Sequence, residues 1–222
     1  MYWKDEGYLL SKTNFDENSI IIEAFTLNHG KCSGVVYGGS SKKLKKNFQI
    51  GNKILLNWKS KSVNKLGYFS TELIKPISPL FFDDKKRSIC FIAATSILKV
   101  LLPERQTNKT IYLSFERLVD QFSHVDWIKL YVFWELSLIK ELGFEISFLD
   151  NYSKNHINNT IKINDRYFKI PKLLLEQNNK NFSKAVIREA LTFNRNLLME
   201  NFILPYSLRL PLSRNILEKY YN

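Results

Sequence analysis

The hydrophobic periodicity of this chain changes near residue 78. Before that point the chain consists of short apolar and β-branched runs typical of strands, one of which has apolar residues at every second position, the period of a strand with one buried face. After it, apolar residues recur at every third or fourth position, which is the period of an amphipathic helix. The change predicts an α+β fold in two domains, residues 1–77 and 78–222.

The first domain is predicted to contain five strands. They cover residues 7–11, 19–26, 31–37, 52–59 and 69–75, and a turn at residues 27–30 makes a hairpin of the second and third. The fourth strand alternates, with Ile54, Leu56 and Trp58 on one face and Lys53 and Lys59 on the other. Trp58 is therefore expected in the core rather than on the surface as a base-stacking platform. Five short strands with a basic loop between the third and fourth predict an OB-like β-barrel.

The second domain is predicted to be mostly helical. Helices are expected over residues 84–101, 111–122, 127–142, 183–199 and 212–221. The third is apolar on most sides and should be central, with Gly143 as its C-cap, and Ser183 should N-cap the fourth. A small β-hairpin is expected at residues 160–170.

One stretch of the predicted barrel is purely cationic. Between Ala24 and Thr71 the chain has nine lysines and no aspartate or glutamate, and the whole chain has a net charge of +12. Such a surface suits a polyphosphate backbone, although a solvated loop in a lysine-rich chain is the alternative. The predicted nucleic-acid-binding residues are Lys31, Lys42, Lys43, Lys45, Lys46, Lys53, Lys59, Lys61 and Lys65.

The two kinds of cation are divided between the domains. All 12 cationic residues before Ser78 are lysines, and all eight arginines follow it. Lysine makes mobile point-charge contacts, whereas arginine makes planar, bidentate contacts with carboxylates and phosphates. The helical half is therefore expected to hold more geometrically defined acidic groups. Lys184, Arg188 and Arg195 share one helix face there, either as a binding stripe or as a solvated one.

No catalytic motif is recognisable. His124 and Asp126 lie together, but no serine or cysteine is placed as a nucleophile beside them. The acid pair Asp83–Asp84 fits a helix start better than a metal site, and no P-loop or dinucleotide fingerprint occurs. Cys32 and Cys90 are too far apart for a zinc motif and are expected to be buried free thiols. The sequence favours a binding protein without a cofactor over an enzyme.

The apolar segments do not predict export or membrane insertion. Acidic residues follow the start of the chain at once, unlike a signal peptide. The most apolar helical run, residues 127–142, carries four charges, which argues against a membrane span. A soluble, cytoplasmic protein associated with the nucleoid is expected.

Several segments together resemble the RecO family of bacterial DNA-repair mediators over nearly the whole chain. The stretch Trp3-Lys-Asp-Glu-Gly-Tyr-Leu-Leu10 is similar to the family's first strand, and Glu135-Leu-Ser-Leu-Ile-Lys-Glu-Leu-Gly-Phe144 is similar to its central helix. The other segments that carry the resemblance are residues 18–30, 34–39, 49–52 and 210–217.

The resemblance implies an OB-fold followed by a helical bundle. It implies binding of single- and double-stranded DNA, strand annealing, and cooperation with RecR in placing RecA on DNA coated by the single-strand-binding protein SSB. It also implies a receptor for the acidic SSB tail, which ends in an apolar residue with a free carboxylate. Arginine suits such a carboxylate, so Arg87, Arg105 and Arg117 are the candidates, with Ile97 and Leu101 as walls.

The chain departs from the family at its zinc ribbon. Many members carry four cysteines after the Leu-Gly-Phe element, but residues 145–172 contain no cysteine here. The protein is therefore expected to fold without zinc, with the predicted hairpin as a metal-free remnant.

Two other functions fit parts of the pattern. An RNA-binding protein with an OB domain has the same barrel and charge, and competition between DNA and RNA of equal sequence would distinguish it. A nuclease or nucleotide-dependent enzyme would need a carboxylate cluster or a P-loop, which the sequence lacks, and would show Mg²⁺-dependent cleavage.

Overall fold

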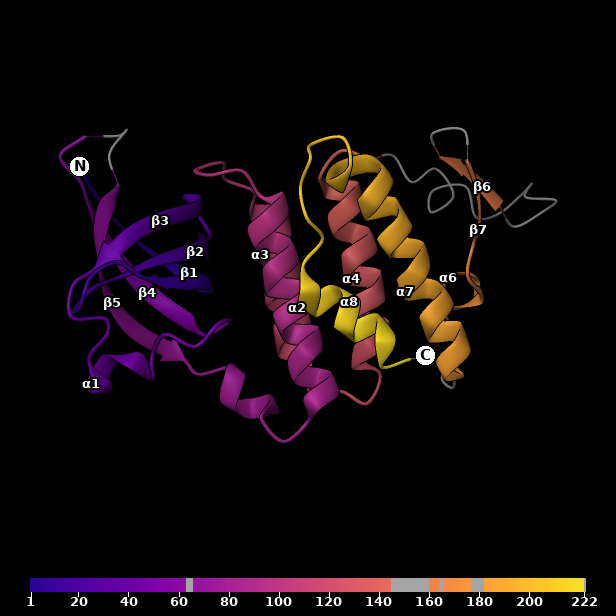
Figure 1. Cartoon of the computed structure of the whole chain (residues 1–222), viewed down its shortest axis with the longest axis horizontal. Helices are drawn as coiled ribbons and strands as arrows, with labels where there is room; N and C mark the ends of the chain where they lie inside the picture. Colours follow the sequence, from indigo (N-terminus) through magenta and orange to yellow (C-terminus); the bar gives the residue numbers. More distant parts are fainter. Residues whose placement is uncertain (63–65, 145–159, 164–165, 177–181, 222) are drawn as a thin grey trace.

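The computed structural model describes residues 1–62, 66–144, 160–163, 166–176 and 182–221. A β-barrel, a group of helices and a small two-stranded sheet follow one another along the molecule's long axis (Figure 1). The predicted α+β fold is therefore confirmed. No helix in the described ranges is long and apolar enough to cross a membrane.

Five strands close the barrel. They are β1 (Tyr2–Asn14), β2 (Ile20–Thr26), β3 (Gly30–Val36), β4 (Lys53–Lys59) and β5 (Gly67–Lys75). Their order is β1-β2-β3-β5-β4, with β3 parallel to β5 and the other pairs antiparallel. A five-stranded barrel with β5 between β3 and β4 matches the predicted OB-like barrel. Strand β1 is longer than predicted because residues 2–8 pair with β4 and residues 7–14 pair with β2.

The inner faces of these strands form a core of their own. Ile54 and Leu56 are fully buried and Trp58 is 5% exposed, so the predicted alternation of β4 and the core position of Trp58 are confirmed. Phe48, from the connection between β3 and β4, fills the same core. The outer face of β4 is thus left to Lys53, Leu55, Asn57 and Lys59.

Three of the main helices begin at a residue whose side chain caps them. The main helices are α2 (Lys85–Leu101), α3 (Lys109–Gln121), α4 (Trp127–Glu141), α7 (Lys184–Leu198) and α8 (Leu212–Lys219). Asp84, Asn108 and Ser183 each accept a hydrogen bond from a backbone N–H in the first turn of the helix that follows. Gly143 ends α4 with φ +98°, as its C-cap prediction required. Asp126 occupies the N-cap position of α4 without a capping hydrogen bond.

Several short elements complete the chain. The expected hairpin is present as β6 (Thr160–Ile163) and β7 (Arg166–Lys169). The 3₁₀ turn η1 (Ser78–Phe81) follows the barrel, α6 (Lys172–Leu175) follows the hairpin, and the π-helical η2 (Met199–Ile203) extends α7. A helical turn, α1 (Lys42–Lys45), occupies the basic segment that the sequence predicted to be a loop. These turns are too short for periodicity to reveal.

A buried ion pair fixes three of the helices together. Glu135 of α4 and Arg214 of α8 are both fully buried, with Arg214 Nε 2.6 Å from one carboxylate oxygen and Nη2 3.0 Å from the other. Arg214 Nη2 also donates to the Leu191 carbonyl of α7 at 2.6 Å, and the Tyr131 hydroxyl donates to Glu135 at 2.9 Å. The two segments that carried the family resemblance in the helical half therefore meet in one network.

A second buried cluster joins the barrel to the helices. Tyr8, Leu10 and Phe25 of the barrel belong to the same buried cluster as Phe91 and Phe115 of the helices. The connection between α2 and α3 also returns to the barrel, where the Arg105 N–H donates to the Lys31 carbonyl at 2.7 Å. Only glycine fits at position 30, because its φ is +68° and a Cβ would lie 2.1 Å from the Gln106 carbonyl oxygen. The division into domains at residue 77 stays a prediction.

Candidate nucleic-acid interface

The short helix α1 presents part of the basic segment on the barrel. Ser41 caps it by accepting from the Leu44 N–H at 3.4 Å, and Leu44 packs against the barrel core together with Phe48. Because the apolar residues face inward, Lys42 and Lys46 are exposed. The side chains of Lys43 and Lys45 and all of Lys65 lie outside the described part of the structure.

A second pair of exposed lysines lies where β4 ends. Lys59 is the last residue of β4, and its ammonium group is 5.7 Å from the centre of the Tyr2 ring. Lys61 follows in the connection to β5 and is also exposed. In Figure 1 the helix α1 lies at the lower end of the barrel, whereas the N-terminus, whose residue Tyr2 pairs with Lys59, lies at the upper end.

Lys31 and Lys53 lie elsewhere, at the junction with the helices. Lys31 Nζ donates to the Lys99 carbonyl of α2 at 2.8 Å, and burial lowers its pKa. Lys53 Nζ is 3.0 Å from Glu6 and 2.8 Å from Glu116 of α3. Burial alone would lower the pKa of Lys53, but its hydrogen bonds with these two carboxylates raise it. Both lysines therefore connect the barrel to the helices. They lie apart from the four exposed lysines at positions 42, 46, 59 and 61.

A polar clasp beside the barrel was not predicted by the sequence. Asp5 is 7% exposed and accepts hydrogen bonds from the Asn28 N–H at 2.8 Å and the Glu6 N–H at 2.9 Å. His29 Nδ1 is 2.9 Å from the same carboxylate, and the His29 ring stacks on Trp3 at 4.2 Å. Burial would raise the pKa of Asp5, but these hydrogen bonds outweigh it and hold the pKa below its usual value. The clasp fixes the turn between β2 and β3 against β1.

The Asp5→Asn variant should lose about 1–2 kcal/mol of stability at neutral pH, because it removes hydrogen bonds to a charged acceptor. A carboxylate whose pKa is lowered by folding stabilises the protein above its unfolded pKa, about 3.9, and loses that effect as the pH falls through the folded pKa. The gap between wild type and variant should therefore close below about pH 4. Urea unfolding at several pH values measures it, with the exposed Asp126→Asn variant as control. A difference in stability between wild type and Asp5→Asn that does not change with pH would contradict a lowered pKa for Asp5.

The three predicted arginines lie at three different places. Arg87 is turned toward the start of α4, with its Nε 3.3 Å from Asp84, Nη1 donating to the Ser123 carbonyl at 3.4 Å and its guanidinium 5.8 Å from the centre of the Trp127 ring. Arg105 lies over Trp58 of the barrel at 5.8 Å, and Arg117 is exposed on α3. Of the predicted walls, Ile97 is only 1% exposed and cannot line a surface pocket.

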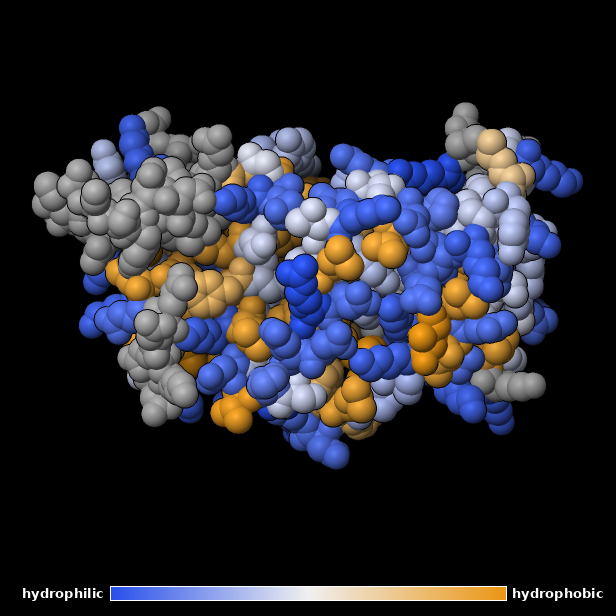
Figure 2. Space-filling view, turned by 180° about the vertical axis from the view of Figure 1, so that it is seen from behind, coloured by the Kyte–Doolittle hydropathy of each residue, from blue (hydrophilic) through white to orange (hydrophobic). Residues whose placement is uncertain are grey.

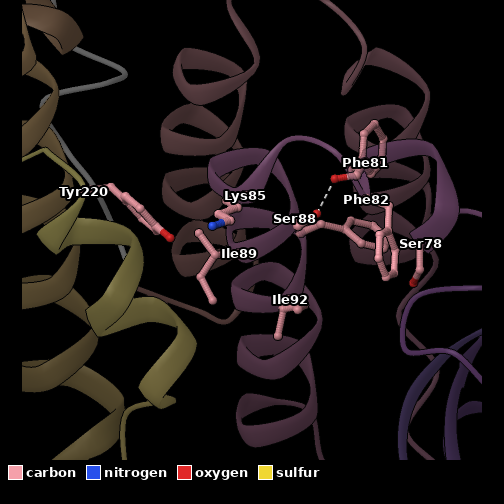
Figure 3. A pocket seen from close by; sticks show the side chains of 9 residues that line it. Ser78, Phe81, Phe82, Lys85, Ser88, Ile89, Ile92 and Tyr220 are labelled. Atoms are coloured by element: carbon pink, nitrogen blue, oxygen red, sulfur yellow. Dashed lines mark hydrogen bonds between the residues drawn. The ribbon is translucent and has the colours of Figure 1, made fainter.

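The described residues do form an apolar pocket with a cation at its edge. It has a volume of about 380 Å³ and lies between η1, the first turns of α2 and the end of α8. Figure 3 shows Phe82 on one side, Ile89 and Ile92 along α2, and Lys85 with Tyr220 on the other side. The Ser88 hydroxyl is occupied because it donates to the Phe81 carbonyl. Phe82 is 78% exposed, which is unusual for so large an apolar side chain.

A second, larger hollow differs in its charge. It measures about 550 Å³ and is lined by the end of α2, the connection between α2 and α3, the end of α4, η2 and the segment after η2, including Leu101, Leu142 and Phe202. Among the described residues that line it, Glu141 is the one that is charged at neutral pH. An acidic peptide would therefore be repelled there and attracted to the pocket beside Lys85.

The predicted basic stripe on α7 is partly occupied within the chain. Arg195 Nε is 3.6 Å from Glu218 of α8. Lys184 and Arg188 are exposed on the same helix. At one end of the stripe Arg195 thus connects α7 to α8, and at the other end Lys184 and Arg188 are exposed to solvent.

Neither cysteine is placed for metal binding or nucleophilic chemistry. Cys32 lies in the barrel core and Cys90 in the helical core, and both are free and buried, as predicted. Burial raises the pKa of the Cys32 thiol to about 12, far above the range of a reactive cysteine. Within the described ranges, no three His, Cys, Asp or Glu side chains gather as metal ligands. His156 and most of residues 145–172, which contain no cysteine, lie outside those ranges.

Comparison with known proteins matches both halves of the chain. Residues 1–77 match the family "Recombination protein O N terminal", and residues 83–157 match "Recombination protein O C terminal". A protein of Wolbachia pipientis from Culex pipiens, named DNA repair protein RecO, is 34% identical over 148 residues, which are 66% of this chain and 60% of that protein. Proteins of the same name from Roseobacter denitrificans and Ehrlichia chaffeensis are 32% and 33% identical, over 66% and 72% of this chain.

The alignment covers only part of each relative. The aligned region spans 60% of the Wolbachia protein, 61% of the Roseobacter protein and 64% of the Ehrlichia protein. On the strength of both matches, the chain belongs to the RecO family.

Proposed function

We propose that this chain is a DNA repair and recombination mediator. It binds single- and double-stranded DNA without sequence specificity, anneals complementary strands, and helps RecR to load RecA onto SSB-coated DNA. Family membership supports the general role, and the cationic barrel supports the DNA contact. The proposed action is binding rather than catalysis.

The proposed DNA contact is supported by four lysines that are exposed and not paired with a carboxylate of the described residues. Lys42, Lys46, Lys59 and Lys61 are exposed on the barrel, and none forms an ion pair within the described part of the chain. Lysine ammonium groups that are free of carboxylates can neutralise phosphates and release counterions. Such contacts carry no base information, so binding should be independent of sequence. Lys43, Lys45 and Lys65 extend the proposed surface by their position in the chain.

Changing these four lysines to alanine should weaken single-stranded DNA binding roughly a hundred-fold near physiological salt, because each lost phosphate contact removes about 0.7 from the slope of log K against log salt. The slope should therefore fall by about 2.8 for all oligonucleotide sequences. A variant with Lys140, Lys169, Lys172 and Lys219 changed to alanine has the same net charge and is the matched control. Fluorescence anisotropy over a salt series measures both. Equal losses in the two variants would contradict the proposed surface.

An RNA-binding OB-fold protein is the alternative. Competition between DNA and RNA strands of equal sequence, at fixed salt, distinguishes the two. An annealing assay with and without SSB then tests the mediator role, and RecA filament formation with RecR tests the loading step. A protein that binds RNA better and does not anneal DNA would fit the alternative.

The SSB tail is the proposed protein partner in the helical half. A tail of acidic residues ending in an apolar side chain needs an apolar cavity beside a cation. The pocket of Phe82, Ile89 and Ile92 offers the walls, and Lys85 offers the cation. Arg87 and Arg117 remain candidates for the acidic residues that precede the end of the tail, whereas Arg105 lies beside the barrel.

Lys85→Glu and Phe82→Asp should each weaken binding of an SSB tail peptide at least ten-fold. The first reverses the charge that would attract the carboxylate, and the second makes the wall polar. Isothermal titration calorimetry measures the affinity, with Lys109→Glu as a control of equal charge change on an exposed residue. If Lys109→Glu weakens binding as much as Lys85→Glu does, the peptide is attracted by the overall charge of the protein and not by this pocket.

A further inference from the structure

Three exposed aromatic rings and a lysine cross the outer face of the barrel in one line. In the strand pairing, Tyr2 of β1 lies opposite Lys59 of β4, and Lys59 lies opposite Tyr68 of β5. Tyr37, at the end of β3, continues the line, with its ring centre 6.1 Å from that of Tyr68. The exposed fractions of the three tyrosines are 60%, 66% and 43% for Tyr2, Tyr37 and Tyr68.

The charge of the outer face changes along the strands. The next outward row toward the helices is Lys4, Asn57 and Ser70, which has no acid. The row after it is Glu6, Leu55 and Glu72, which has two. The acidic residues of this face therefore lie toward Lys53, which pairs with Glu116 of α3, whereas the aromatic line lies at the other end of β4, two residues before the exposed Lys61.

The rings are held without being covered. Strand pairing fixes the backbones of Tyr2 and Tyr68, and the Tyr2 hydroxyl donates to Asn57 Oδ1 at 3.1 Å. The planes of Tyr37 and Tyr68 are tilted by 51°, so they do not stack on each other face to face. The rings of Tyr37 and Tyr68 therefore do not cover each other, and at Tyr2 the Lys59 ammonium group lies 5.7 Å from the ring centre. Figure 2 shows the barrel on the right, with both hydrophilic and hydrophobic residues on its surface.

We infer that Tyr2, Tyr37 and Tyr68 form a base-stacking platform for single-stranded DNA, with Lys59, Lys61 and Lys4 holding its phosphates. Aromatic rings beside a cationic track are how proteins bind single strands without reading their sequence, since every base has a π-face. Double-stranded DNA cannot use the platform because its bases are already stacked. This inference rests on the proposed DNA binding and deepens it: the lysines serve both forms of DNA, and the tyrosines serve single strands.

The test compares oligothymidylate with an abasic strand of equal length, using the full chain. Tyr37→Ala and Tyr68→Ala should each weaken binding of oligothymidylate by about five-fold to a hundred-fold. They should leave binding of the abasic strand and of duplex DNA unchanged, with the same salt dependence. Tyr37→Phe and Tyr68→Phe keep the ring and should bind as the wild type does. Tyr167→Ala, at an exposed tyrosine of β7, is the control.

The outcomes separate the inference from the proposed function. If the wild type binds oligothymidylate and the alanine variants bind it equally well, the platform is wrong and the DNA contact stands. Equal losses on the abasic strand and oligothymidylate also overturn the platform, because they show a disturbed barrel rather than lost stacking. A wild type that prefers RNA of equal sequence overturns the choice of DNA as occupant. A wild type that binds neither strand contradicts the proposed function itself.

Discussion

Arg214→Ala should lower the free energy of unfolding by about 3–5 kcal/mol, because it leaves a carboxylate buried without its partner. Glu135 has no exposed side-chain surface, and in the variant only the Tyr131 hydroxyl would still donate to it. The change would also strip the Leu191 carbonyl of its hydrogen bond from Arg214. The network joins α4, α7 and α8, so its loss should loosen the packing of all three.

Urea unfolding followed by circular dichroism measures the loss. Arg209→Ala, at an exposed arginine just before α8, is the matched control and should change stability by less than about 0.5 kcal/mol. The double variant Glu135→Leu/Arg214→Met should be more stable than Arg214→Ala, because no buried charge is left unpaired. A double variant that is as unstable as the sum of its single variants would show that the ion pair is not the source of the effect.

Phe115→Ala should cost about 3–5 kcal/mol as well, through the cavity that it leaves. Phe115 of α3 is fully buried, and its ring centre lies 5.0 Å from that of Tyr8 in the barrel and 5.8 Å from that of Trp134 in α4. The cavity would therefore open between the barrel and the helices rather than inside either. The exposed Phe82→Ala is the control for loss of a phenyl ring.

The same variant tests the predicted domain division. Because Tyr8 and Phe25 are buried in the cluster that includes the helices, the barrel and the helical part should unfold in one transition, and Phe115→Ala should shift it as a whole. Differential scanning calorimetry, with the ratio of calorimetric to van't Hoff enthalpy, measures this cooperativity. Two transitions, with the one from the barrel unmoved, would show independent domains at residues 1–77 and 78–222.

Local patterns in the sequence were enough to predict the elements of the fold. Short apolar and β-branched runs located the five barrel strands, although β1 is longer than predicted, and the helical period located the five main helices within a few residues. Ser183 and Gly143 marked helix ends through their own backbone chemistry, which depends only on neighbours. The resemblance to the RecO family was visible for the same reason, since it rests on short segments in order.

The tertiary structure decided which charged residues are free. Nine lysines in an acid-free stretch look equivalent in the sequence. Lys53, however, meets Glu6 from another strand and Glu116 from a helix more than 60 positions away, while Lys59 meets neither. Such ion pairs cannot be predicted from the sequence, because the two partners lie far apart along the chain. The same holds for Arg214, an arginine on a short helix that became the centre of a buried network.

The grouping of the three exposed tyrosines could not be predicted from the sequence either. Tyr2, Tyr37 and Tyr68 are scattered along the chain, and no periodicity connects them. They come together because strand β5 inserts between β3 and β4 and because register sets Tyr2, Lys59 and Tyr68 side by side. Local propensity determined which residues form strands, whereas the closure of the barrel, a cooperative and long-range event, determined which of their side chains share a surface.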